Sequence, residues 1–312
     1  MKTIVTKSLG SFFAVLVLLL PPAVWAEGGQ MSDDGFSITP ELMTGTTKSA
    51  PDGNASTVGL SYSFGKSIAN KSPEEQLAQC RVGTSTQIPE GGCENTLSTF
   101  NAGVSATGKL AADSNVNVGN AINFAGTAGY EFYKLDSVPS SLATGTGKIN
   151  IKIGYEANPN QATRNYTYGI STYGYYSPSG APSWMNFPSG LLEFERVNPA
   201  ADKARKSVDA TLSNFSRGHI RISAGLKFPD VVQGRDLKLD FKFDHWREVN
   251  PSSAIVAAGL DRQTFRAASV TFPGTGKDPD WQITYASGNV PANQASAKVW
   301  QLGWNWKFNK PQ

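Results

Sequence analysis

The ten residues from Val299 to Phe308 constrain the fold of this chain more than any other stretch. They read V-W-Q-L-G-W-N-W-K-F. Alternate side chains of a strand point to opposite faces. One face would be aromatic and apolar, with Trp300, Leu302, Trp304, Trp306 and Phe308. The other would be polar, with Gln301, Gly303, Asn305 and Lys307. A soluble edge strand with such an aromatic face invites aggregation, so the pattern predicts a strand between lipid and a water-filled lumen.

The N-terminal end has the form of a secretory signal peptide. Lys2 and Lys7 precede a short apolar run over residues 12–20, and the small residue Ala26 follows. The run is too short to span a bilayer as a helix. We expect cleavage after Ala26, which removes residues 1–26 and exports the mature chain.

No apolar run after residue 26 is long enough for a transmembrane helix. Only helices and closed barrels satisfy all their backbone groups in lipid, so the mature chain is either an exported soluble β-protein or a membrane barrel. The aromatic face of the last stretch favours the barrel. The mean hydropathy of -0.29 fits it, because half of each strand faces water. A formal net charge of +3 without a basic run gives no support for nucleic-acid binding.

Alternation of apolar and polar residues predicts twelve strands. They cover residues 56–65, 97–110, 116–132, 148–155, 165–176, 191–197, 207–215, 220–228, 237–243, 265–272, 281–286 and 299–308. The segment 207–215 is weakly apolar. Residues 36–43 form a short strand interrupted by Pro40, and if it belongs to the barrel the count is fourteen.

This strand pattern predicts one barrel domain at residues 56–308, after an N-terminal periplasmic segment at 27–55 and before a tail at 309–312. If the last strand ends in the periplasm, the connections alternate between the two sides, and the external ones should be longer. The expected external connections are 66–95, 136–147, 177–188, 216–218, 247–262 and 288–296.

The signal peptide, the alternating strands and the aromatic strand Trp300–Phe308 together resemble Gram-negative outer-membrane β-barrel proteins. The resemblance covers nearly the whole mature chain as an architecture and points to no particular family. It implies an all-β, antiparallel, up-and-down transmembrane barrel in the cell outer membrane. Its partners would be outer-membrane lipid and the barrel-insertion machinery. Residues 309–312 depart from the pattern, since such chains usually end on the aromatic residue itself.

Cys80 and Cys93 are the two cysteines of the chain. In an exported protein they are expected to form one disulfide, within a connection expected to be external. No histidine lies near them, so no metal site is predicted, and no cofactor is expected.

Charged side chains gather on the predicted lumen face. The expected pore-lining residues are Lys109, Lys148, Lys152, Arg221, Lys227, Lys238, Asp240, Lys242, Asp244 and Lys307. The run from Lys238 to Asp244 reads either as a ladder of paired charges that braces the wall or as the polar track of a pore. The small positive excess favours anions or neutral sugars weakly.

Aromatic residues at strand ends are expected to form girdles at the membrane interface. The predicted lipid-facing girdle of the last strand is Trp300, Trp304, Trp306 and Phe308. The tyrosines between residues 166 and 176, with Trp184 and Trp246, are expected at the same level or as a sugar-stacking platform.

No catalytic residue is predicted. His219, Arg221 and Ser223 share the predicted lumen face, but residues four apart on a strand are too far apart for a histidine to activate a serine. A lipid-modifying hydrolase would need a histidine and a serine that meet on the outer wall.

The predicted function is a porin-like passive channel for small polar or anionic solutes. Two alternatives stay open: a non-transport barrel that acts through its external loops in a structural, adhesive or assembly role, and an outer-membrane lipid-modifying enzyme. The channel requires a water-continuous lumen, whereas the non-transport barrel predicts charges paired across a plugged lumen. The sequence does not fix the oligomeric state.

Cleavage of the signal peptide can be tested directly. Intact-mass spectrometry of protein extracted from membranes should give a chain that begins at Glu27, because signal peptidase cuts after a small residue such as Ala26. A chain that retains residues 1–26 would contradict this prediction.

Overall fold

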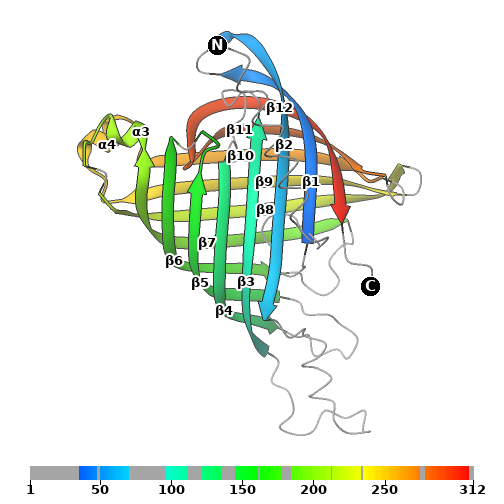
Figure 1. Cartoon of the computed structure of the whole chain (residues 1–312). Helices are drawn as coiled ribbons and strands as arrows, with labels where there is room; N and C mark the ends of the chain where they lie inside the picture. The colour runs from blue at the N-terminus through cyan, green and yellow to red at the C-terminus, as the bar shows by residue number, and fades with distance from the viewer. Residues whose placement is uncertain are drawn as a thin grey trace, which may run out of the picture.

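The computed structural model describes residues 35–47, 50–69, 96–111, 121–134, 145–160, 162–176, 184–211, 213–232, 235–274 and 278–308. Twelve antiparallel strands close into one barrel, with each strand beside its neighbours in sequence and β1 paired with β12 (Figure 1). The predicted all-β, up-and-down barrel of twelve strands is therefore confirmed, and the alternative count of fourteen is wrong.

The strands are β1 (Gly35–Thr47), β2 (Ala50–Ala69), β3 (Thr96–Ala111), β4 (Ala121–Lys134), β5 (Gly145–Ala157), β6 (Thr163–Tyr176), β7 (Met185–Asp202), β8 (Phe215–Val232), β9 (Arg235–Val249), β10 (Arg262–Phe272), β11 (Asp280–Val290) and β12 (Asn293–Phe308). Two short helices, α3 (Lys203–Lys206) and α4 (Ser253–Ala257), connect β7 to β8 and β9 to β10. Within the described residues, neither helix is long and apolar enough to cross a membrane.

The barrel begins earlier than Ser56, where the sequence placed its start. Residues 35–47 form β1, which was assigned to the N-terminal segment 27–55 because of Pro40. The pairs between β1 and β12 pass from Ile38 to Glu41 and omit the proline, so its missing N–H group costs the ladder little.

The predicted strand at 207–215 is wrong. Just before this segment, residues 203–206 form α3. The Asp202 side chain accepts a hydrogen bond from the Arg205 backbone N–H at 2.9 Å, which caps the helix. Further along, Asp209 Oδ1 accepts hydrogen bonds from the backbone N–H and the hydroxyl group of Thr211. These local side-chain bonds favour a turn over a strand.

The two errors cancel in the strand count but not in the topology. With β1 added at the start and the predicted strand 207–215 removed, every strand before β7 runs in the direction opposite to the one expected. The C-terminal ends of β2, β4 and β6 therefore lie at one end of the barrel, and the connections at 250–261 and 291–292 lie at the other. The expected external set is thus divided between the ends, and 216–218 lies inside β8.

The outer wall of the barrel is apolar, as the alternation predicts. Ile151 and Ile153 on β5 are 67% and 68% exposed, and Ile170 and Trp300 are 60% and 57% exposed. Trp304 and Trp306 share the outward phase of Trp300 on β12. The predicted girdle residues of β12 thus lie on the outer face, except that the side chain of Phe308 lies outside the described part of the structure.

The inner wall is polar on most strands, with one apolar exception. Met43, Ala286, Ala297 and Val299 form a buried cluster inside the barrel, next to Phe265. These residues come from β1, β10, β11 and β12, so the cluster lies on the inner wall where β1 pairs with β12. The signal peptide 1–26, Cys80, Cys93 and the tail 309–312 lie outside the described residues.

A charge on the outer wall should reveal lipid contact. Ile151→Arg should lower the free energy of unfolding in lipid vesicles by about 2–4 kcal/mol, because the residue lies mid-strand on the apolar face, whereas Val231→Arg, near the end of β8, should cost about 0–1 kcal/mol. Urea titration of the vesicle-inserted protein measures both. Equal costs at the two positions would contradict a membrane-spanning outer wall.

Candidate functional site

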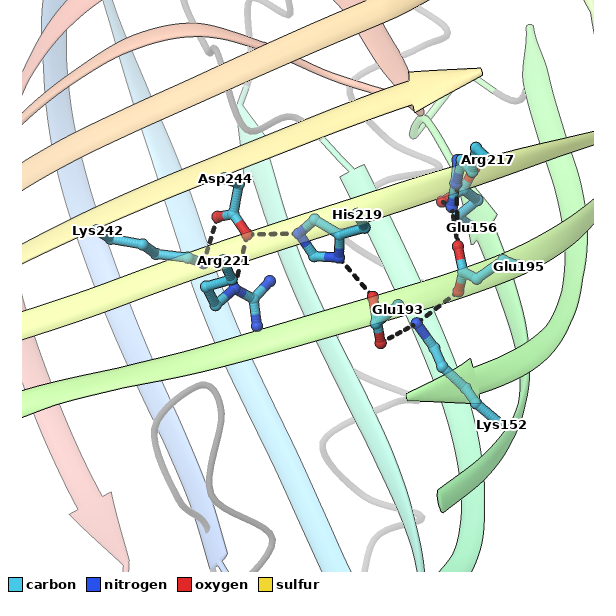
Figure 2. Close-up of polar contacts among 9 residues, drawn as sticks. All are labelled: Lys152, Glu156, Glu193, Glu195, Arg217, His219, Arg221, Lys242 and Asp244. Atoms are coloured by element: carbon cyan, nitrogen blue, oxygen red, sulfur yellow. Dashed lines mark hydrogen bonds and ion pairs between the residues drawn. The ribbon is translucent and has the colours of Figure 1, made fainter. Parts of the chain in front are cut away.

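A network of nine polar residues occupies the inner wall between β5 and β9 (Figure 2). Every member lies at an inward position of its strand. The members are Lys152 and Glu156 on β5, Glu193 and Glu195 on β7, Arg217, His219 and Arg221 on β8, and Lys242 and Asp244 on β9.

Lys152 joins β5 to β7 across β6. Its ammonium group lies 3.0 Å from Glu193 Oε1 and 2.7 Å from Glu195 Oε1. On β6, the residue in register with both Lys152 and Glu195 is Gly169. A Cβ atom there would collide with the Phe194 carbonyl oxygen. The position therefore has to be a glycine, and the absence of a side chain there leaves space over β6 for the lysine.

Arg217 is a structural cation that uses four of its five N–H donors on carboxylates. Nε and Nη2 donate to Glu195 Oε2 at 2.9 and 2.8 Å, while Nη1 and Nη2 donate to the two oxygens of Glu156 at 2.8 Å each. The residue is 4% exposed. Buried ion pairs are tolerated only with such full hydrogen bonding, so this group braces the wall of β5, β7 and β8.

His219 lies between two carboxylates and against an aromatic ring. Its Nδ1 contacts Glu193 Oε2 at 2.5 Å, and its Nε2 contacts Asp244 Oδ1 at 2.8 Å. The imidazole stacks on Trp246 with ring centroids 4.4 Å apart. Trp246 was expected in the outer girdle. It instead points inward and is 8% exposed, because it has the same strand phase as Asp244.

Asp244 collects cations from two strands. Arg221 Nε donates to its Oδ1 at 2.6 Å, and Lys242 Nζ lies 3.3 Å from its Oδ2. The Lys242 contact is the one pair of the predicted 238–244 ladder that the described ion pairs contain, whereas the arginine and the histidine reach Asp244 from β8. Cross-strand pairing thus dominates over pairing along the strand.

Cations and carboxylates differ in how much of each side chain water reaches. The side chains of Lys152, Arg221 and Lys242 are 20%, 26% and 40% exposed. Those of Glu195 and Asp244 are each 1% exposed. Short carboxylates stay close to the backbone, whereas long basic side chains extend over them. In these pairs the carboxylates therefore lie at the wall and the cations face the lumen, whereas Arg217 is as buried as its glutamate partners.

The other predicted pore-lining residues lie in smaller pairs. Lys109 contacts Glu41 at 2.8 Å and donates to Gln301 Oε1 at 2.7 Å, and Lys148 contacts Glu131 at 2.9 Å. Lys227 pairs with Asp236, where both side chains are about one third exposed or more. Lys238 is exposed, Asp240 has the inward phase of β9, and the side chain of Lys307 lies outside the described part.

A second, smaller cluster lies at the end of the barrel that carries α3 and α4. Both Nη atoms of Arg205 donate to Glu248, at 2.7 and 3.1 Å, and its guanidinium lies 3.9 Å from the centroid of the Phe215 ring. A cavity beneath is lined by Asn165, Asp202, Arg205, Phe215, Arg217, Glu248, Leu260, Asp261, Gln263 and Pro291. These residues come from β6 to the β11–β12 turn, so α3 narrows this mouth.

Several of these residues were not predicted as site residues. Glu156 has the same strand parity as Lys148 and Lys152, so the alternation already carried its signal. Arg217 was placed in a turn at 216–218. Arg205 lies just before the wrongly predicted strand 207–215. The direction of its side chain depends on the fold of α3, which the strand pattern does not encode.

The geometry does not assemble a catalytic serine. Both ring nitrogens of His219 contact carboxylates, so Ser223 is not its partner. On the outer wall, His245 Nδ1 lies 2.9 Å from Thr264 Oγ1, and no hydrogen bond within the described residues orients its other nitrogen. The described residues also contain no cluster of three or more His, Cys, Asp or Glu side chains that could hold a metal ion.

No protein-family model matches the chain. No curated protein sequence matches it either. Among solved structures, it is similar to the anion-selective porin from Comamonas acidovorans, with 9% identity, 88% of this chain and 98% of that chain covered, and a TM-score of 0.39. The outer membrane channel DcaP of Acinetobacter baumannii has 6% identity, coverage of 88% and 95%, and a TM-score of 0.39. The translocator domain of the autotransporter NalP from Neisseria meningitidis has 12% identity, coverage of 97% and 96%, and a TM-score of 0.31.

Removing one buried charge should test whether the network braces the barrel. Glu195→Gln leaves Lys152 and Arg217 with less compensation in a buried place, so the free energy of unfolding should fall by about 3–5 kcal/mol. Urea titration in vesicles measures the loss. Asp236→Asn, at the exposed pair with Lys227, serves as the control and should leave the unfolding midpoint unchanged. Equal midpoints for both variants would show that the network does not contribute to stability.

Proposed function

We propose that the protein is a passive outer-membrane channel for small polar solutes that prefers anions. One observation carries the proposal, the difference in exposure between four inner-wall cations and their carboxylate partners. The side chains of the cations are 19–40% exposed, and those of the carboxylates are 1–9% exposed. The cations are Lys109, Lys152, Arg221 and Lys242. A solute in the lumen therefore meets ammonium and guanidinium groups before it meets carboxylates.

The preference comes from layering and not from net charge. The network holds four permanent cations, Lys152, Arg217, Arg221 and Lys242, and four carboxylates, Glu156, Glu193, Glu195 and Asp244. The charges balance before His219 is counted. A wall with its positive ends toward water still presents a positive potential to a nearby ion, and lumen walls with exposed cations select anions.

Three features together support a location in the outer membrane. The barrel is closed, so no strand edge is left open to lipid. Its outer wall is apolar. The N-terminal residues have the form of a signal peptide. Together these features support export, insertion by the barrel-insertion machinery and contact with outer-membrane lipid.

The direction of the ion pairs supports a channel over a plugged barrel. The described pairs between barrel strands join strands within three positions of each other in the ring, such as Lys152 to Glu195, Lys109 to Glu41 and Arg217 to Glu156. They run along the wall and leave opposite walls unlinked. A barrel held shut by charge pairs would instead join opposite walls.

A second candidate is a non-transport barrel that acts through its loops. The specific observation in its favour is the narrowing of one mouth, where Arg205 of α3 bridges to Glu248 over Phe215. In this case, purified protein inserted in a bilayer would not conduct.

Single-channel recording in planar bilayers tests the proposal. The full chain should give stable conductance steps, and in a potassium chloride gradient its reversal potential should show anion preference, because exposed cations line the lumen. Lys242→Gln removes the most exposed network cation and should reduce that preference. Lys298→Gln, at an exposed position on the outer phase of β12, is the matched control and should leave it unchanged.

Absence of conductance from a barrel shown to be inserted by protease protection would contradict the channel. Conductance with cation preference would contradict the role of the exposed lysines and Arg221.

A further inference from the structure

Among the described residues, three arginines reach the interior of the barrel, and in two of them a glutamate already occupies the Nη1–Nη2 edge of the guanidinium. Nη1 and Nη2 of Arg217 donate to the two oxygens of Glu156, and its Nε and Nη2 donate to Glu195. Nη1 and Nη2 of Arg205 donate to the two oxygens of Glu248. In both, the edge that could bind two oxygens of an oxyanion is taken by a carboxylate of the protein itself.

Arg221 differs from the other two. Within the part of the chain that the structure describes, only its Nε is engaged, donating to Asp244 Oδ1 at 2.6 Å. In Figure 2 the outer end of the guanidinium is directed away from Asp244, and no dashed line reaches it from the residues drawn. The side chain is 26% exposed. The two Nη atoms, which hold four N–H donors, are therefore open to the lumen.

Lys242 lies on the other side of the same carboxylate. Its Nζ makes a 3.3 Å contact to Asp244 Oδ2, and its side chain is 40% exposed. Arg221 and Lys242 thus share the carboxylate of Asp244 and lie beside one another at the lumen surface. The ammonium group also retains donors for a further acceptor.

The opposite wall adds to this charge. Lys109 lies on β3, six positions from β9 in the ring of twelve strands, and its side chain is 19% exposed. Its own partners, Glu41 and Gln301, are 8% and 4% exposed. Positive groups therefore face the lumen from two walls.

We propose that Arg221 and Lys242 form an oxyanion-binding site in the lumen, which takes the carboxylate or phosphate group of a small solute. The site rests on the proposed channel function and names the class of solute. A planar guanidinium binds two oxygens of such a group in parallel, and the ammonium adds a charge-assisted hydrogen bond.

The orientation of the Arg221 guanidinium is fixed before a solute arrives. Asp244 is 1% exposed, and it is held by the His219 ring at 2.8 Å. His219 in turn stacks on Trp246 and contacts Glu193. Asp244 therefore fixes the Nε end of the Arg221 guanidinium, and Arg221 loses little side-chain freedom when an oxyanion binds.

This geometry separates oxyanions from halides. Chloride is a single sphere and cannot match two parallel N–H groups as a carboxylate or phosphate does. Chloride should therefore pass with weak retention, whereas an oxyanion should dwell at the site and interrupt the chloride current.

The test measures block of chloride current by sodium phosphate and by sodium acetate, each scaled to the current of the same variant without oxyanion. Arg221→Lys keeps the charge but removes the fork, so the blocking concentration should rise by about tenfold or more, which equals about 1.4 kcal/mol. Arg262→Lys, at an exposed position on the outer phase of β10, is the matched control. Its chloride current should be blocked at the same oxyanion concentration as that of the unaltered protein. Stronger block by phosphate than by acetate assigns the site to phosphate groups, and the reverse order assigns it to carboxylates.

Calorimetric titration of the detergent-solubilised full chain with the same two salts separates this inference from the channel. Phosphate or acetate binding that is lost in Arg221→Lys, in a protein without conductance, would retain the site and remove the channel. Conductance with equal block in the unaltered protein and Arg221→Lys would retain the channel and overturn the site. If Arg221→Lys does not fold, Lys242→Gln is the second variant, and oxyanion binding that it leaves unchanged would also overturn the site.

Discussion

The antiparallel pairing of β1 with β12 is the contact on which the rest of the structure depends. It runs from Phe36 opposite Phe308 to Thr47 opposite Ala297 and turns an open sheet into a closed ring. Closure removes the two edges whose backbone N–H and C=O groups would otherwise lack strand partners. It also defines an inside and an outside, and with a side-chain period of two a slip of one residue would exchange them. Every inward charge therefore depends on closure of the ring and on the register of its own strand.

The fold could be predicted because alternation is a local property of each strand. The last strand and the strands at 148–155 and 237–243 have the phases that their sequences indicate. The failures have local physical causes. Pro40 suggested a break, but it falls where the β1–β12 pairs are interrupted. Residues 207–215 suggested a strand, but the cap at Asp202 and the turn at Asp209 lead the chain through a helix and a loop. Such compensating bonds are not visible in a hydrophobic pattern.

The candidate site could be predicted in its members but not in its pairing. Arg221, Lys242 and Asp244 were expected at inward positions, and parity alone is enough to place them there. Which cation contacts which carboxylate depends on the offset between strands that are far apart in sequence, as where Lys152 passes over Gly169 to reach Glu195. Trp246 shows the opposite error: its aromatic character suggested the membrane interface, although its parity placed it inside, against His219.

Bracing the wall and lining a pore appeared as alternatives in the sequence, but one arrangement serves both. A carboxylate at the wall is costly to bury unless cations and hydrogen bonds surround it, and Asp244 meets this need with Arg221, His219 and Lys242. The side chains long enough to reach it from neighbouring positions are basic, and their outer ends remain in water. Satisfying the buried acid therefore places unused N–H donors toward the lumen. The stability of the wall and the positive face of the lumen then have the same cause, so a substitution that weakens one is expected to change the other.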